Sequence, residues 1–189
     1  MGIMSSTDMK QESKSENNQV PSKEVRDRLQ VFMKKGGCEN SYTACLGCDS
    51  REEECTEAYS MLEKCMKARF DYFEPYLALK NASAEVMARE IEVFLHAKPN
   101  DRGELLGKFM TRGDCKEAFM AWMDSYEEAK KNKGSLYTPA SNTLSKCIEA
   151  HSDYYQPLLT VLKNYKEHYS KERIAFLDAW EQAQAEAEG

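Results

Sequence analysis

The sequence has no long apolar run, and no stretch of its 189 residues approaches the roughly 18 consecutive apolar residues of a membrane-spanning helix. It also has no basic stripe with interleaved aromatics, and its formal net charge is -6. Phosphate binding depends on clustered Lys and Arg, so binding to nucleic acid is not expected. These absences predict a chain that neither crosses a bilayer by itself nor binds nucleic acid.

Catalytic and metal-binding signatures are missing as well. The sequence contains no Gly-rich phosphate loop, no Ser-His-Asp order and no HExxH motif. Its three histidines, His96, His151 and His168, share no spacing with a carboxylate or thiol that would suggest a triad or a metal site. We therefore expect a protein that is not an enzyme and that holds no cofactor and no metal.

Residues 1–26 have no aromatic side chain and only three β-branched apolar residues, Ile3, Val20 and Val25. A segment of this composition cannot bury enough apolar surface to become ordered, so disorder is predicted. It shows neither the apolar core of a signal peptide nor the Arg-rich, acid-poor character of a transit peptide. Its first six residues, MGIMSS, fit the short pattern for myristoylation of Gly2, and membrane contact is expected only if Gly2 is acylated.

The sequence does contain an internal repeat. The run FMKKGGC at residues 32–38 matches FMTRGDC at residues 109–115. Further along, LEKCMKA followed by DYFEP, beginning at Leu62, matches LSKCIEA followed by DYYQP, beginning at Leu144. The offset grows between the two matches, so the second copy has additional residues in its middle, where turn-forming residues indicate a surface connection.

Within each copy, aromatic residues and cysteines recur at three- and four-residue steps, and no stretch alternates as a strand would. A proline, Pro75 or Pro157, is expected to open a longer helix after each hairpin. The predicted fold is all-α, with two tandem disulfide-stapled antiparallel helical hairpins, each followed by a long helix. The predicted ranges are 1–26 for a disordered N-terminal segment, 27–98 for the first hairpin with its following helix, 99–107 for a linker, and 108–189 for the second hairpin with a long C-terminal helix.

Four of the seven cysteines are evenly spaced in the first copy. Nine residues separate Cys38 from Cys48, and nine separate Cys55 from Cys65. If each pair lies on one helix of an antiparallel hairpin, nesting joins Cys38 to Cys65 at the open end and Cys48 to Cys55 beside the turn. The outer bridge is expected to contribute roughly 3 kcal/mol to a hairpin that is too small to be stable alone.

The second copy retains only the outer pair. Cys115 and Cys147 occupy the outer positions, which predicts a third bridge, while the inner positions have become Ser125 and Tyr137. Losing two of four ligands would destroy a zinc site, whereas separate bridges can be lost one at a time. The comparison between copies therefore favours disulfides over a metal.

Cys45 is the seventh cysteine and is predicted to be a free thiol. It aligns with Trp122 of the second copy, which favours a small apolar group on the inner face of a helix. The alternative is a redox role together with Cys48, since a thiol one turn away from a disulfide can attack it. Nothing in the sequence suggests the exposure and lowered pKa that a catalytic thiol needs.

The repeated motifs resemble known families. The twin Cys-x9-Cys arrangement is similar to that of the coiled-coil-helix-coiled-coil-helix class of small mitochondrial proteins. The runs FMKKGGC, LEKCM and DYFEP, with CKEAFMAW at 115–122 and CIEAHSDYY at 147–155, resemble the plant GCK domain. This resemblance covers about residues 27–98 and 105–165, and it implies the hairpin fold without implying an activity.

The resemblance also implies oxidation in the mitochondrial intermembrane space, where the import machinery recognises apolar side chains beside a docking cysteine. Tyr42, Tyr59 and Leu62 are candidates for that recognition, although they would serve equally well to fill the hairpin seam. The related import oxidoreductase carries a further cysteine pair that transfers electrons. The corresponding stretch at 27–30, DRLQ, has no thiol, so the resemblance does not imply an enzyme.

Together these features predict a non-enzymatic scaffold or assembly protein of the mitochondrial intermembrane space. It would bind protein partners through the helices that follow Pro75 and Pro157. The alternative function is thiol-disulfide exchange through Cys45 and Cys48. A further interpretation places the same helices in the cytoplasm with reduced thiols, since the lack of a presequence fits either compartment.

Overall fold

The computed structural model describes residues 23–48, 53–132 and 138–189, and every regular element within these ranges is an α-helix. The helices are α1 (Lys23–Lys35), α2 (Glu39–Leu46), α3 (Glu53–Ala68), α4 (Phe70–Leu95), α5 (Arg102–Arg112), α6 (Lys116–Lys131), α7 (Pro139–Ala150) and α8 (Ser152–Glu188). The prediction of an all-α fold with two tandem disulfide-linked hairpins, each followed by a long helix, is confirmed.

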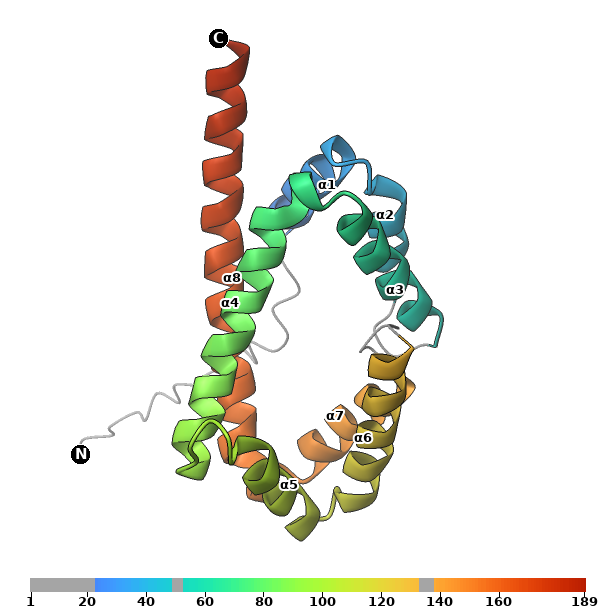
Figure 1. Ribbon diagram of the computed structural model, residues 1–189, viewed down its shortest axis with the longest axis vertical. Helices are drawn as coiled ribbons and strands as arrows, with labels where there is room; N and C mark the ends of the chain where they lie inside the picture. Colours follow the sequence, from blue (N-terminus) through green and yellow to red (C-terminus); the bar gives the residue numbers. More distant parts are fainter. Residues whose placement is uncertain (1–22, 49–52, 133–137) are drawn as a thin grey trace, which may run out of the picture.

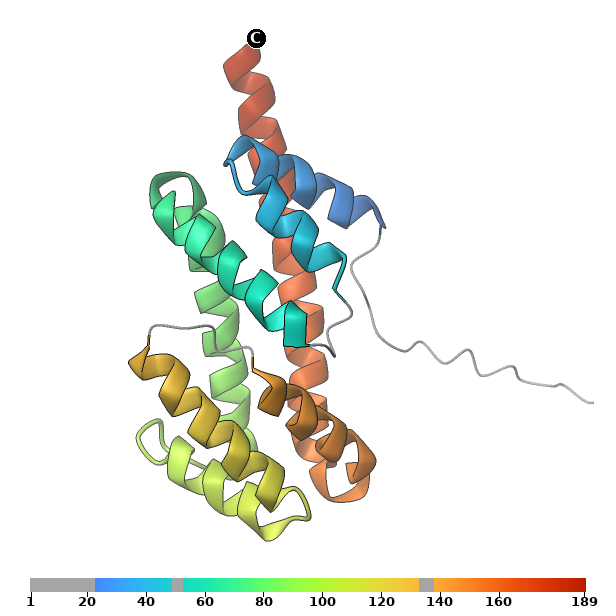
Figure 2. The ribbon, with the colours of Figure 1, turned by 90° about the vertical axis from the view of Figure 1, so that its right-hand side faces the viewer.

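Each repeat forms a unit of four helices, α1 to α4 in the first and α5 to α8 in the second. Helices α2 and α3 form one hairpin, and α6 and α7 form the other. As Figure 1 shows, α4 and α8 run side by side in opposite directions and form one side of the molecule, while the two hairpins lie on the other side. The C-terminal end of α8 extends beyond all other helices (Figures 1 and 2).

Two helices begin inside ranges that were predicted to contain none. Helix α1 begins at Lys23, inside the segment predicted to be disordered, because Val25 is buried against the first core. Residues 1–22 of that segment, including Gly2, lie outside the described residues. Helix α5 begins at Arg102 within the predicted linker, where the Arg102 guanidinium pairs with Glu92 of α4 at 2.7 Å.

The prediction that Pro75 and Pro157 open their helices is wrong. Pro75 lies inside α4, which begins at Phe70, and Pro157 lies inside α8, which begins at Ser152. A proline at this depth removes the N–H that would bond to the carbonyl four residues earlier, which is that of Asp71 in α4. Because Asp71 and Pro75 are both exposed, water can solvate that carbonyl instead.

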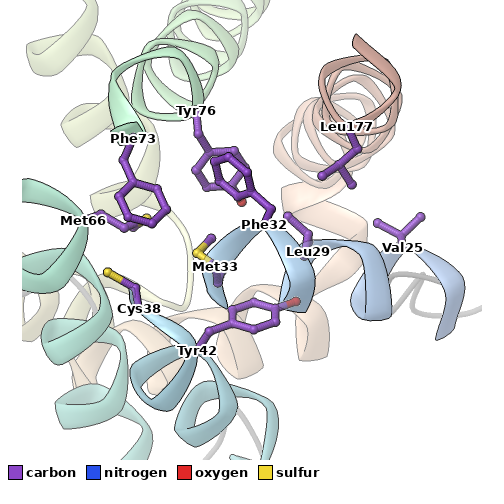
Figure 3. Close-up of a cluster of buried hydrophobic side chains, with 10 residues drawn as sticks. All are labelled: Val25, Leu29, Phe32, Met33, Cys38, Tyr42, Met66, Phe73, Tyr76 and Leu177. Atoms are coloured by element: carbon purple, nitrogen blue, oxygen red, sulfur yellow. The ribbon is translucent and has the colours of Figure 1, made fainter. Parts of the chain in front are cut away.

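The core of the first unit contains residues from all four of its helices and from α8. Phe32 of α1 is at its centre, and its ring contacts the rings of Phe73 and Tyr76 of α4 with centroids 5.4 and 5.5 Å apart. Figure 3 shows this cluster, which consists of Val25, Leu29, Phe32, Met33, Cys38, Tyr42, Met66, Phe73, Tyr76 and Leu177. Leu177 belongs to α8 of the second unit, so the first unit shares its core with the second.

Charged contacts support this junction between α1 and the end of α8. The Arg28 guanidinium bonds to the carboxylates of Asp178 at 2.5 Å and Glu181 at 2.8 Å. About two turns further along α1, the Lys35 ammonium lies 5.5 Å from the centroid of the Trp180 ring and 2.9 Å from the side-chain oxygen of Gln184. Exposed ion pairs of this kind each contribute little, so burial of Leu177 and its neighbours supplies most of the stabilisation.

The second unit has an equivalent core at corresponding positions. Its buried members are Met110, Cys115, Phe119, Ile148, Tyr155 and Leu158. Phe109, which matches Phe32, contacts the ring of Tyr155 edge-on with centroids 5.7 Å apart. It also contacts Phe94 at the end of α4 at 4.9 Å, which is a second apolar connection between the units.

We predict that Leu177→Ala destabilises the whole chain, although residue 177 lies beyond both hairpins. Its side chain has no exposed area, so removing it leaves a cavity in the first core and should lower the free energy of unfolding by about 2–5 kcal/mol. Denaturant unfolding followed by circular dichroism measures the change. Ile174→Ala on the same helix, where the side chain is 37% exposed, is the control and should cost much less; equal losses for the two variants would contradict the shared core.

Candidate functional site

A disulfide joins the start of the second helix of each unit to the end of the third. Cys38 is joined to Cys65 and Cys115 to Cys147, with Cα atoms 5.9 and 5.7 Å apart. Cys38 and Cys115 are the N-cap residues of α2 and α6, and both are almost fully buried. These are the two outer bridges predicted from the sequence.

The chain reaches Cys38 through a tight helix end. The N–H of Gly37 bonds to the carbonyl of Lys34 at 2.9 Å, and the N–H of Cys38 bonds to that of Met33 at 2.8 Å. This pair of bonds is a Schellman motif, which requires a residue with positive φ, and Gly37 has a φ of 74°. The glycine thus sets the direction in which Cys38 enters the hairpin.

The preceding glycine is required by the close approach of two aromatic rings. A Cβ atom added at Gly36 would collide with the rings of Phe73 and Tyr72. The Tyr72 hydroxyl also donates a hydrogen bond to the carbonyl of Phe32 at 3.0 Å, next to the end of α1. In this way the repeated Asp-Tyr-aromatic run packs back onto the glycine before the disulfide.

In the second unit, the turn from the first helix to the second is held by a different hydrogen bond. Asp114 replaces Gly37, and the N–H of Cys115 donates to the hydroxyl of Tyr155 at 3.1 Å. That hydroxyl lies 3.4 Å from the carbonyl of Met110 and donates to it. The Tyr155 hydroxyl therefore stands between the two groups whose counterparts, Cys38 and Met33, bond directly in the first unit.

The three other cysteines are in the first hairpin. Cys45 and Cys55 are buried, and Cys48 is half-buried. The predicted inner bridge between Cys48 and Cys55 is not formed in the structure. The reason is the length of α2, which ends at Leu46 with Gly47 as its C-cap, so Cys48 does not continue the helix that the nested pairing assumed.

The environment of Cys45 favours its protonated form. Burial raises the pKa of its thiol to about 11, the nearby Cys55 acts in the same direction, and the charge of Lys80 opposes them without overcoming burial. At neutral pH roughly one such thiol in ten thousand is ionised, and only the thiolate is a good nucleophile. This environment agrees with the interpretation of Cys45 as a small apolar group.

Lys80 faces the first hairpin from α4. Its side chain is exposed to solvent, yet partial desolvation lowers the pKa of its ammonium group, and Glu63 and Lys67 act on it in opposite directions. The corresponding residue of the second unit is Leu162. The cation is therefore a feature of the first unit that the repeated fold does not require.

A cluster of hydroxyl groups lies where α8 packs against the first unit, and it was not predicted from the sequence. The hydroxyls of Tyr76 and Tyr169 are 3.2 Å apart, and the Arg173 guanidinium lies 5.4 Å from the centroid of the Tyr169 ring. Burial raises the pKa of Tyr42 to about 12, and the charge of Arg173 opposes that rise. Helices α2, α4 and α8 thus meet through polar as well as apolar groups.

The second unit is apolar at the matching positions, where Phe119 replaces Tyr42 and Leu158 replaces Tyr76. This difference between the copies was the sequence signal that could have indicated the hydroxyl cluster. Its members were missed because aromatic residues at helical spacing were interpreted as packing alone.

Two of the three histidines lie next to a carboxylate. The Nδ1 atom of His151 lies 3.2 Å from a carboxylate oxygen of Asp114, and that of His168 lies 3.8 Å from Glu172. His96 is the C-cap of α4 with a φ of 50°. Within residues 23–48, 53–132 and 138–189, no three potential ligands gather closely enough to hold a metal ion.

None of the helices in these ranges combines the length and the apolar character that crossing a membrane requires.

The candidate residues for recognition by the import machinery differ in how far they are buried. Tyr42 is buried in the first core, whereas Leu62 is only partly buried at its edge.

We predict that Tyr155→Phe destabilises the protein by about 1–3 kcal/mol, because it leaves the buried N–H of Cys115 and the carbonyl of Met110 without their bridging hydroxyl. Tyr154→Phe is a matched control. It removes the bond from an adjacent, 40% exposed tyrosine to the carbonyl of Phe109, and water can replace that bond. Denaturant unfolding of both variants tests the difference, and an unchanged stability of Tyr155→Phe would show that the bridge is not needed.

Comparison with known proteins identifies one family. The GCK domain matches the chain twice, at residues 25–90 and 102–172. No curated protein and no solved structure matches the chain. The first match runs from within α1 to within α4, and the second runs from the start of α5 to within α8, so each falls on one four-helix unit.

Proposed function

Because the chain belongs to the GCK domain family and carries two GCK units in tandem, we propose that it is a non-enzymatic scaffold or assembly protein that binds other proteins. The observation that supports this proposal is the state of the cysteines, which include four in disulfides and, at Cys45, a buried thiol. Four cysteines close the two units, and the thiol of Cys45 is buried with a pKa of about 11. Such an arrangement fixes the shape of a helical surface and favours no exchange chemistry.

The long helices are the proposed binding surfaces. Their facing sides are used within the chain, where α4 and α8 pack on each other and α8 covers part of the first core. Their other sides retain exposed apolar residues, Val93 on α4 and Ile174 on α8. Partners would therefore contact the outward sides of the helices that contain Pro75 and Pro157.

The mitochondrial intermembrane space is the compartment that we propose. The buried positions of Cys38 and Cys115 support it, because bridges of this kind form and persist where the environment is oxidising. A plant origin and a relation to the coiled-coil-helix-coiled-coil-helix class belong to the same proposal and rest on the resemblance of the motifs. Import machinery that recognised Tyr42 would have to do so before folding, since the folded unit buries that side chain.

Two alternatives are retained as outcomes of experiments. Thiol-disulfide exchange would use Cys45 and the half-buried Cys48. A cytoplasmic protein with reduced thiols would touch membranes only through acylated Gly2, which lies outside the described residues.

The two functions make opposite predictions for a variant that combines Cys45→Ala, Cys48→Ala and Cys55→Ala. A scaffold should keep all the complexes that the parent protein forms in its cell, because the two structural bridges remain. A redox relay should lose every mixed disulfide and the partners held by it. Chemical crosslinking followed by mass spectrometry of the parent and the variant compares them, with circular dichroism as the check that the variant folds. Loss of the parent's complexes from a folded variant would contradict the scaffold proposal.

A further inference from the structure

Helices α4 and α8 leave a shallow apolar groove of about 440 Å³ between them. On the α4 side it is lined by Val86, Arg89, Glu90 and Val93, and on the α8 side the buried Val161 contributes to it. Val93 is 75% exposed, more than any other large apolar side chain recorded in the described part of the chain. Figure 2 shows the two helices side by side.

The four α4 residues form a single stripe. Their spacing of three, four and seven residues places them on one face of the helix. The two valines are separated by almost two turns, about 10 Å along the axis, and the two charged residues lie midway between them. The stripe is therefore apolar at both ends and carries one positive and one negative charge at its centre.

The order of residues along the stripe, valine, arginine, glutamate and valine, is complementary to the same stripe running in the opposite direction. In two antiparallel copies of α4 related by a twofold axis between residues 89 and 90, Val86 of each copy faces Val93 of the other. The same axis places Arg89 opposite Glu90 of the second copy, twice. A surface that matches itself under a twofold rotation is what an isologous dimer requires.

The charges within one chain leave this pairing available. The Arg89 side chain donates only to the backbone carbonyl of Glu85, at 3.4 Å, and forms no ion pair within the described ranges. Glu90 accepts one hydrogen bond from the exposed Asn164 side chain at 3.2 Å. A parallel arrangement would place Arg89 opposite its own copy, so charge repulsion selects the antiparallel one.

The repeated fold does not account for the stripe. In α8 the matching residues of the second unit are His168, Lys171, Glu172 and Ala175. Both valines are therefore absent from the equivalent face of the helix that α4 packs against. Their presence in α4 adds an apolar surface that neither core uses.

We propose that α4 is a self-association surface, on which a second copy of this chain docks antiparallel so that Val86 meets Val93 and Arg89 meets Glu90 across a twofold axis. The valines of each copy then fill the groove between α4 and α8 of the other, which produces a layer of four helices. One helix pair buries less than the roughly 1,200–2,000 Å² of a standard interface, so the dimer is weak and depends on concentration. The dimer uses Val93, which also belongs to the proposed partner-binding surface, but its formation does not depend on the scaffold function.

Sedimentation velocity of the full chain, from micromolar to near-millimolar concentration, should show a monomer–dimer equilibrium. Val93→Glu places a carboxylate in the apolar contact and should weaken the dimer by about a hundredfold or more. Met120→Glu changes a 48% exposed apolar residue on α6, away from the groove, and is the control that should leave the equilibrium unchanged. Circular dichroism checks that both variants fold.

Charge reversal tests the register itself. Arg89→Glu and Glu90→Arg each place like charges opposite one another and should weaken the dimer by about tenfold, whereas the double variant R89E/E90R should restore it. Three outcomes would overturn the proposal. These are a parent chain that stays monomeric at every concentration, a dimer that Val93→Glu does not weaken, and a double variant no better than the single ones.

Discussion

The corner at which the first helix of each unit ends is the constraint on which the rest of the structure depends. At this corner a glycine accepts the close approach of two aromatic rings, and the cysteine two residues after it is fixed at the N-cap of the following helix by its disulfide. The rings belong to the start of the fourth helix, so the first, second, third and fourth helices all meet at one point. Small helices that would be marginal alone are held together in this way.

The two units solve the same geometric problem with different chemistry. The first uses a glycine with positive φ, which lets the N–H of Cys38 reach the carbonyl of Met33 directly. The second has Asp114 at that position and inserts the Tyr155 hydroxyl between the equivalent groups. The presence of Phe73 in one copy and Tyr155 in the other is thus explained by the residue just before the cysteine, which is Gly37 in the first unit and Asp114 in the second.

Much of the fold could be predicted because the repeat preserves its outer cysteines, its glycine and its aromatic pair together. The inner bridge was predicted wrongly because cysteine spacing does not reveal that α2 ends at Leu46. The insertion of Leu177 into the first core was also beyond the sequence, since an apolar periodicity shows that a helix has a buried face without showing what covers it. The same limit concealed the contact between Arg173 and Tyr169, which depends on how α8 lies against α4.

The central claim is that the disulfides Cys38–Cys65 and Cys115–Cys147 hold the two units of the functional protein together. Rapid alkylation of the protein from its native source, under acid-quenched, denaturing and non-reducing conditions, followed by intact mass and peptide mapping, tests it most directly. The account predicts that Cys38–Cys65 and Cys115–Cys147 are found intact and that the thiol of Cys45 is labelled. Labelling of all seven cysteines would contradict it, because the units would then be held by packing alone and the proposed oxidising compartment would lose its support.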